Sequence, residues 1–286
     1  MIKVDIKACI RYDIGDRYQY ALVGVRLMEK KYSYEDLIDI MAKLRGEGGC
    51  SWDREQTHES LIPHFLEETY EVIDAVKNQD VSGIQEELGD VLLQVVFHSQ
   101  IAKEAEQFTM EDVIHGIATK LVYRHPHIFG EVVADTPEKV SKNWEKLKKK
   151  EKNMSTQTQV LESVPKVLPA LMRAYKVQKK AGDVGFDWDD YKPAKEKIYE
   201  ELEELEQEIS QNNHERLEEE LGDVLFSVVN LGRLVKVNPE FALTKSVEKF
   251  INRFRYIEKT ALEKGLQLEK MTLEEMNQLW EDAKQM

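Results

Sequence analysis

The sequence predicts an all-α protein that contains two tandem copies of one helical domain. Apolar residues recur at helical spacing over most of the 286 residues, as in the series Leu61, Phe65, Val72 and Val76. The chain has only 14 Gly and 7 Pro, too few for the many turns of a β-sandwich or barrel. An acidic segment also occurs twice. At about 150 residues per domain, the length favours two domains over one.

The composition excludes several classes of function. The chain has 40 Lys and Arg against 54 Asp and Glu, a net charge of −14, which argues against a nucleic-acid or anionic-membrane partner. No uncharged run approaches the roughly 18 residues of a membrane span, and no secretory signal follows Met1. Two cysteines, Cys9 and Cys50, are too few for a disulfide framework or a thiolate zinc site. We therefore expect a cytoplasmic protein.

Four segments follow one another along the chain. Residues 1–32 alternate loosely between apolar and polar, which fits one or two strands or the end of an upstream domain and leaves their role open. Helical spacing of apolar residues predicts a first domain over 33–145 and a second over 160–286. Between them, residues 146–159 are charged and then polar without an apolar period, so we interpret them as a linker.

The two domains repeat one pair of motifs. The segments are EETYE and EELGDVLLQVV in the first domain, and EELEE and EELGDVLFSVV in the second, at 67–71, 86–96, 200–204 and 219–229. Their spacing is also the same, since 19 positions separate Glu68 from Glu87 and Glu201 from Glu220. Internal repetition of this kind indicates a duplicated domain.

The repeated motifs predict facing carboxylates in the first domain. Residues three apart lie on one helix face, so Glu68 pairs with Glu71, and Glu87 with Asp90. The turn signal at 78–83 contains an Asp and a Ser that could cap the second helix. If the helices fold back as a hairpin, Glu68 lies opposite Asp90 and Glu71 lies opposite Glu87, and both of these pairs are centred on residue 79. All four carboxylates then face one another.

The second domain repeats this arrangement with Glu201, Glu204, Glu220 and Asp223, which are mirrored about Asn212. Carboxylates that face each other repel unless a cation binds or some are protonated. Oxygen ligands without His or Cys favour Mg²⁺, with Mn²⁺ as the alternative. A single Glu pair in so acidic a chain would more simply be a solvated helix face. Four mirrored carboxylates, found twice, favour a metal site.

These motifs resemble the EExxE…ExxD signature of the MazG family of nucleoside triphosphate pyrophosphohydrolases, in its tandem-domain form. Similar flanking segments extend the resemblance over about 33–286; they are GCSWDREQTHESLIP, RHPHIFG, VPKVLPALMRAYKVQKKAGDVGFDW and EKFINRF. The resemblance implies a fold of the four-helix-bundle type and a homodimer. It also implies Mg²⁺-dependent hydrolysis of NTPs and dNTPs to the monophosphate and pyrophosphate, for housecleaning or regulation of nucleotide pools.

The resemblance also implies roles for individual residues. The second-domain carboxylates would be the catalytic metal ligands, and Glu68, Glu71, Glu87 and Asp90 the metal ligands of the first domain. The nucleotide contacts would be Lys197, Glu200, Lys249, Arg253 and Trp280. Lys and Arg neutralise phosphate, and Trp offers a flat face for a base.

The two sites are not expected to be equal. Four residues before Glu201 stands Lys197, one helical turn away and suited to meet a phosphate, whereas the same count from Glu68 reaches His64. Histidine is shorter and mostly neutral at pH 7. We therefore predict that the second domain carries the main active site.

Other functions fit these residues less well. A scaffold or a nucleotide-sensing module without turnover would share the fold but release no pyrophosphate. A Nudix hydrolase lacks support because the Arg-Glu pair expected before the paired glutamates is GluArg at 215–216 and SerGly at 82–83. The chain also has no GKS or GKT for a P-loop. No Glu-x-x-His in the repeated motifs supports a di-iron centre. We interpret Trp52 and Trp188 as core anchors rather than as platforms for a base.

Overall fold

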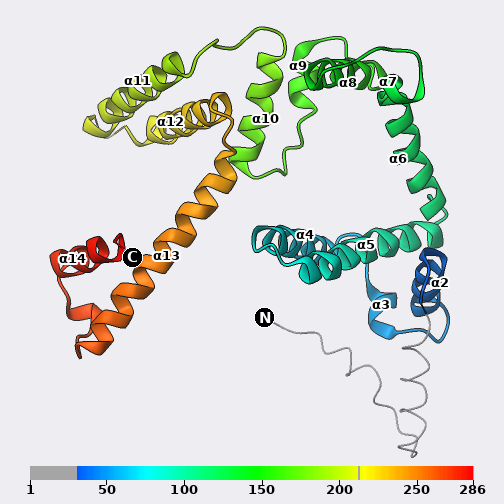
Figure 1. Ribbon diagram of the computed structural model, residues 1–286, viewed down its shortest axis with the longest axis horizontal. Helices are drawn as coiled ribbons and strands as arrows, with labels where there is room; N and C mark the ends of the chain where they lie inside the picture. The colour runs from blue at the N-terminus through cyan, green and yellow to red at the C-terminus, as the bar shows by residue number, and fades with distance from the viewer. Residues whose placement is uncertain (1–30, 212, 286) are drawn as a thin grey trace, which may run out of the picture. The chain divides into compact units, whose positions relative to one another are not determined.

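The computed structural model describes residues 31–211 and 213–285, and it divides into two compact units, Met1–Trp144 and Glu145–Met286 (Figure 1). The all-α prediction is confirmed: over these described residues the regular structure is helical throughout, with no strand. None of the described helices is long and apolar enough to cross a membrane. The expectation for residues 1–32 falls almost entirely outside the described residues, as does the turn centre Asn212.

The first unit surrounds a small apolar core. Its helices are α2 (Tyr34–Arg45), α3 (Ser51–Glu55), α4 (Ile62–Lys77), α5 (Val81–Glu104), α6 (Met110–Arg124), α7 (Pro126–Phe129) and the start of α8 (Pro137–Glu151). Met41, Leu61, Val96, Phe97 and Met110 are buried together where α2, α5 and α6 meet. This core fixes one end of α5, whereas the acidic motif lies nearer the other end.

The second unit repeats this helical plan. Its helices are α9 (Gln157–Glu162), α10 (Ala170–Gly182), α11 (Tyr191–Ser210), α12 (His214–Leu234), α13 (Pro239–Glu263), the 3₁₀ helix η2 (Leu268–Lys270) and α14 (Leu273–Ala283). Helix α10 packs against α12 and α13, and α14 packs against α13. Val160, Ala194, Val229, Ile257 and Leu279 are among its buried apolar residues.

Each acidic motif lies on a helical hairpin, as predicted. Helices α4 and α5 pack side by side, and so do α11 and α12 (Figure 1). The first turn reverses the chain through Gln79, whose φ of 55° is left-handed, and Asp80 caps α5 by accepting a 3.0 Å hydrogen bond from the Gly83 amide. The predicted Asp cap is therefore confirmed, and the hairpin aligns the two acidic faces.

Residues 146–159, the predicted linker, are partly helical. Helix α8 continues through residue 151, and α9 begins at Gln157. Lys, Glu and Leu are strong helix formers, so this stretch is helical without an apolar period. One contact also ties it to the rest of the second unit: Gln157 Nε2 donates to the backbone oxygen of Lys180 at 2.5 Å.

Candidate active site

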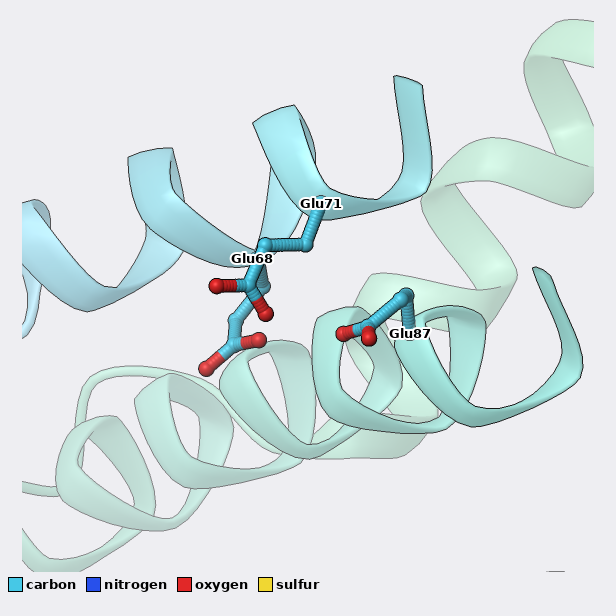
Figure 2. A group of neighbouring side chains, drawn as sticks. All are labelled: Glu68, Glu71 and Glu87. Atoms are coloured by element: carbon cyan, nitrogen blue, oxygen red, sulfur yellow. The ribbon is translucent and has the colours of Figure 1, made fainter. Parts of the chain in front are cut away.

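The first hairpin brings three carboxylates together. Glu68 and Glu71 on α4 point toward Glu87 on α5, and oxygens of the three groups lie within 4.8 Å of one another (Figure 2). The spacing of three residues places the α4 pair on one face, and the hairpin turn sets α5 opposite it. We call this group the first triad.

The second hairpin repeats the geometry with Glu201 and Glu204 on α11 and Glu220 on α12, again within 4.8 Å. We call this group the second triad. Its Glu201 and Glu220 are only 6% and 4% exposed. Because burial of a carboxylate is costly unless a partner offsets it, both buried groups call for a cation.

The fourth predicted carboxylate of each domain lies outside these triads. Asp90 still acts on the first triad, since its charge helps to raise the pKa of Glu68. Asp223 instead lines a cavity together with Lys197 and Glu201. The prediction that all four carboxylates converge therefore holds for three of them in each unit at this distance.

The carboxylates of the first triad repel one another. Burial raises the pKa of Glu68 to about 7, and the charged neighbours that add to this shift, Asp90, Glu71 and Glu87 foremost, are all carboxylates. Burial also raises the pKa of Glu87 and of Asp90, with further contributions from nearby acids. A divalent cation would relieve this repulsion.

The second triad is compensated by two basic side chains. Lys197 binds Glu201 at 2.7 Å and Glu200 at 2.9 Å, and its hydrogen bonds to these two groups raise its own pKa. Arg216 binds Glu220 at 2.7 Å and also Glu208 at 3.0 Å. Burial raises the pKa of Glu220, and the charge of Arg216 opposes this rise.

Arg216 was not among the residues predicted from the sequence. The available signal was its position four residues before Glu220, the spacing of an ion pair on one helix face. Counting four residues back from Glu87 in the first unit reaches Gly83, which has no side chain to offer. Likewise His64 stands where the second unit has Lys197, and its ring lies edge-on to Trp52, with centroids 6.1 Å apart.

The donor set of both triads fits a hard divalent cation. Every ligand atom is a carboxylate oxygen, and the atoms are close enough to share an ion. In the second unit, a bound cation would take over the compensation that Lys197 and Arg216 now supply. These side chains would then be free to turn toward an anionic ligand.

A cavity of about 540 Å³ adjoins the second triad. Lys197, Glu201 and Asp223 contribute to its lining, as do aromatic residues that include Trp188. Trp188 is 39% exposed and Trp52 is 47% exposed, so the interpretation of both as core anchors is wrong. Trp188 sits in the loop between α10 and α11.

Two of the remaining predicted nucleotide contacts, Arg253 and Trp280, form a separate cluster. The Arg253 guanidinium lies over the Trp280 ring at 5.3 Å, and Phe250 packs against the same ring at 5.1 Å. Within the described part of this chain, neither these residues nor Lys249 line the cavity beside the second triad. Arg124 over Trp144, also at 5.3 Å, is the same pair in the first unit, which supports the duplication.

Replacing equivalent glutamates should change stability in opposite directions in the metal-free protein. At pH 8, Glu68→Gln removes a charge from a repelling cluster and should stabilise the protein by about 1 kcal/mol. Glu201→Gln leaves Lys197 without its buried partner and should destabilise it by about 1 kcal/mol. Calorimetric unfolding in EDTA measures both changes, and shifts of the same sign would contradict this account.

The effect of Glu68→Gln should depend on pH. The folded pKa of Glu68, about 7, lies above the usual 4.5, so between these values the native state holds a proton that the unfolded chain lacks. Glu68 therefore costs stability progressively as pH rises from 4.5 to 7. The increase in folding stability caused by Glu68→Gln should be full at pH 8 and absent below pH 4.5.

Comparison with known proteins identifies the family. Residues 56–129 and 190–258 each match the MazG nucleotide pyrophosphohydrolase domain. The chain is 48% identical to the nucleoside triphosphate pyrophosphohydrolase/pyrophosphatase MazG of Thermotoga maritima, over 88% of this chain and 95% of that protein. It is 43% identical to the nucleoside triphosphate pyrophosphohydrolase of Escherichia coli K12, over 87% of this chain and 95% of that protein. It is also 48% identical to the uncharacterized protein YabN of Bacillus subtilis, over 91% of this chain and 54% of that protein. The resemblance is confirmed, and the chain belongs to the MazG family.

Proposed function

We propose that this protein hydrolyses nucleoside triphosphates and deoxynucleoside triphosphates to the monophosphate and pyrophosphate, with Mg²⁺ as cofactor and Mn²⁺ as a substitute. The observation that carries the proposal is the pair of carboxylate triads on mirrored hairpins, in a chain of the MazG family. Relatives that match almost their whole length are named for this activity. Such a protein would clean or regulate nucleotide pools, and we propose the cytoplasm as its location.

The residues of the second unit have distinct roles in this reaction. Glu201, Glu204 and Glu220 would hold the metal, and Asp223, which lines the adjoining cavity, would complete the ligand set. When bound, Mg²⁺ supplies charge neutralisation for the triphosphate and lowers the pKa of a water molecule. Lys197 turns toward a phosphate, with Glu200 beside it. One carboxylate of the triad orients the attacking water, and the bond to the pyrophosphate group breaks.

The second site is proposed to do most of the hydrolysis. It has Lys197 and Arg216 where the first unit has His64 and Gly83. A charge-assisted contact to phosphate contributes about 1.5–3 kcal/mol, which is roughly ten- to a hundredfold in binding. The first site, which lacks both side chains, is proposed to be weaker, more selective or regulatory.

A homodimer is proposed to complete the bundle. Apolar side chains of the second unit that are exposed in the single chain include Leu202, Leu221, Leu225, Phe250 and Phe254. Two packed helices cannot bury such faces alone, and four-helix bundles cover them with two further helices. A second copy would also carry Lys249, Arg253 and Trp280 to the nucleotide, with Trp280 holding the Arg253 guanidinium against its ring.

The products distinguish this activity from related hydrolases. With Mg²⁺, each NTP and dNTP of a panel should give pyrophosphate and the monophosphate, and EDTA should abolish the reaction. Ion chromatography of the products measures this. Orthophosphate as the primary product, or turnover in EDTA, would refute the proposed chemistry.

Paired substitutions test which site is active. Glu220→Gln with Asp223→Asn should lower kcat/KM at least a hundredfold, because it removes charge from the metal ligands of the main site. The matched pair Glu87→Gln with Asp90→Asn should leave most of the activity. Steady-state kinetics at saturating Mg²⁺ measures both. The reverse pattern would assign the main site to the first unit.

The assembly is tested by mass. Light scattering at working concentration should give about twice the 33.3 kDa of one chain. The apolar residues of α11 to α13 are then buried between copies, so Leu225→Glu should shift the mass toward one chain. A wild-type mass near 33.3 kDa would count against the dimer.

A further inference from the structure

The second hairpin has a facing ion pair that the first hairpin lacks. Glu208 on α11 comes seven residues after Glu201, so it lies on the same helix face as the second triad. Across the hairpin, its Oε1 lies 3.0 Å from Nη1 of Arg216 on α12. The equivalent positions of the first hairpin are Ala75 and Gly83, where a Cβ on the glycine would lie 3.3 Å from that of the alanine. The second unit therefore has an ion pair where the first has two small residues.

Arg216 joins this ion pair to the second triad. Its Nη1 contacts Glu208, and its Nη2 contacts Glu220 at 2.7 Å. Both glutamates are buried, whereas the side chain of Arg216 is 55% exposed, so an anion from solvent can reach it. A guanidinium also carries more N–H donors than these two contacts use. Arg216 can therefore hold a buried carboxylate and donate to a phosphate at the same time.

A divalent cation at the triad would affect the two contacts of Arg216 differently. Glu220 belongs to the triad, so a bound cation would take its oxygens and weaken its ion pair with Arg216. Glu208 lies outside the triad. Of the two carboxylates that contact Arg216 in the described part of the chain, Glu208 is thus the one for which the cation does not compete.

We propose that Glu208 is a positioning residue, which holds Arg216 beside the second triad when a divalent cation takes Glu220. The guanidinium then meets the phosphates of the substrate instead of turning into solvent. The inference rests on the proposed function. A role in substrate binding also accounts for the pair better than a role in stability, because packed apolar residues are usually at least as stabilising as a buried ion pair.

Inorganic tripolyphosphate tests the contact without a base or a sugar. The full chain is used with Glu87→Gln and Asp90→Asn, so that the second triad is the metal site under test. In this background, Glu208→Gln should raise the Kd of tripolyphosphate about tenfold at saturating Mn²⁺, because Arg216 is no longer held. The matched control Glu206→Gln removes an exposed carboxylate from the same helix and should change this Kd less than about twofold. Titration calorimetry measures both.

The affinity for Mn²⁺ separates Glu208 from Arg216. Arg216→Gln should lower the Kd of Mn²⁺, because it removes a cation that competes for Glu220. Glu208→Gln should raise this Kd about threefold, because Arg216 then has Glu220 as its remaining carboxylate partner and competes for it more strongly. Electron paramagnetic resonance of free Mn²⁺ measures both constants, and an unchanged stoichiometry checks that each variant keeps the site.

The double variant tests whether Glu208 acts through Arg216. Glu208→Gln with Arg216→Gln should bind tripolyphosphate no more weakly than Arg216→Gln alone. A further loss as large as the one that Glu208→Gln causes by itself would overturn the proposal, as would equal effects of Glu208→Gln and Glu206→Gln. These binding constants do not depend on turnover. Absence of pyrophosphate from the wild-type reaction would refute the proposed function and leave this test intact.

Discussion

Close approach of like charges across a helical hairpin is the constraint on which the rest of this structure depends. Three carboxylates meet within 4.8 Å in each unit, and such a group is stable only with a cation or a proton. In the first unit protonation relieves the repulsion, since the pKa of Glu68 is raised to about 7. In the second unit the positive charges of Lys197 and Arg216 relieve it. A divalent metal would relieve the repulsion in either unit.

The hairpin can sustain this repulsion because other contacts hold its ends. Asp80 caps α5 beside the first turn, and the Met41 and Phe97 core fixes the far end of α5. In the second unit α10 packs on α12, and Gln178 ties the two helices through the Phe226 carbonyl. The acidic faces are therefore positioned by packing elsewhere in each unit.

Duplication has produced two versions of one site that differ in few positions. The triads are alike in residue type and spacing, and each unit keeps an Arg over a Trp at 5.3 Å. The differences are at the charges around the triads, where a Lys and an Arg face a His and a Gly. Lys and Arg serve both as counterions to carboxylate and as contacts for phosphate, so these are the positions through which we propose that the two sites differ in substrate binding.

The sequence by itself predicted the helical class, the duplication and the facing carboxylates of each hairpin, because helical periodicity and a mirrored turn are local properties that a chain displays directly. Helix α8 shows the limit of that reasoning, since strong helix formers need no apolar period. Only the tertiary structure decided that Asp90 and Asp223 lie outside the triads, that Arg216 reaches both Glu208 and Glu220, and that Trp188 is exposed. Only the tertiary structure likewise shows that the Oε1 atom of Gln178 is buried without a hydrogen-bond partner. These features depend on which side chains meet across separate helices, and spacing along one helix does not specify that.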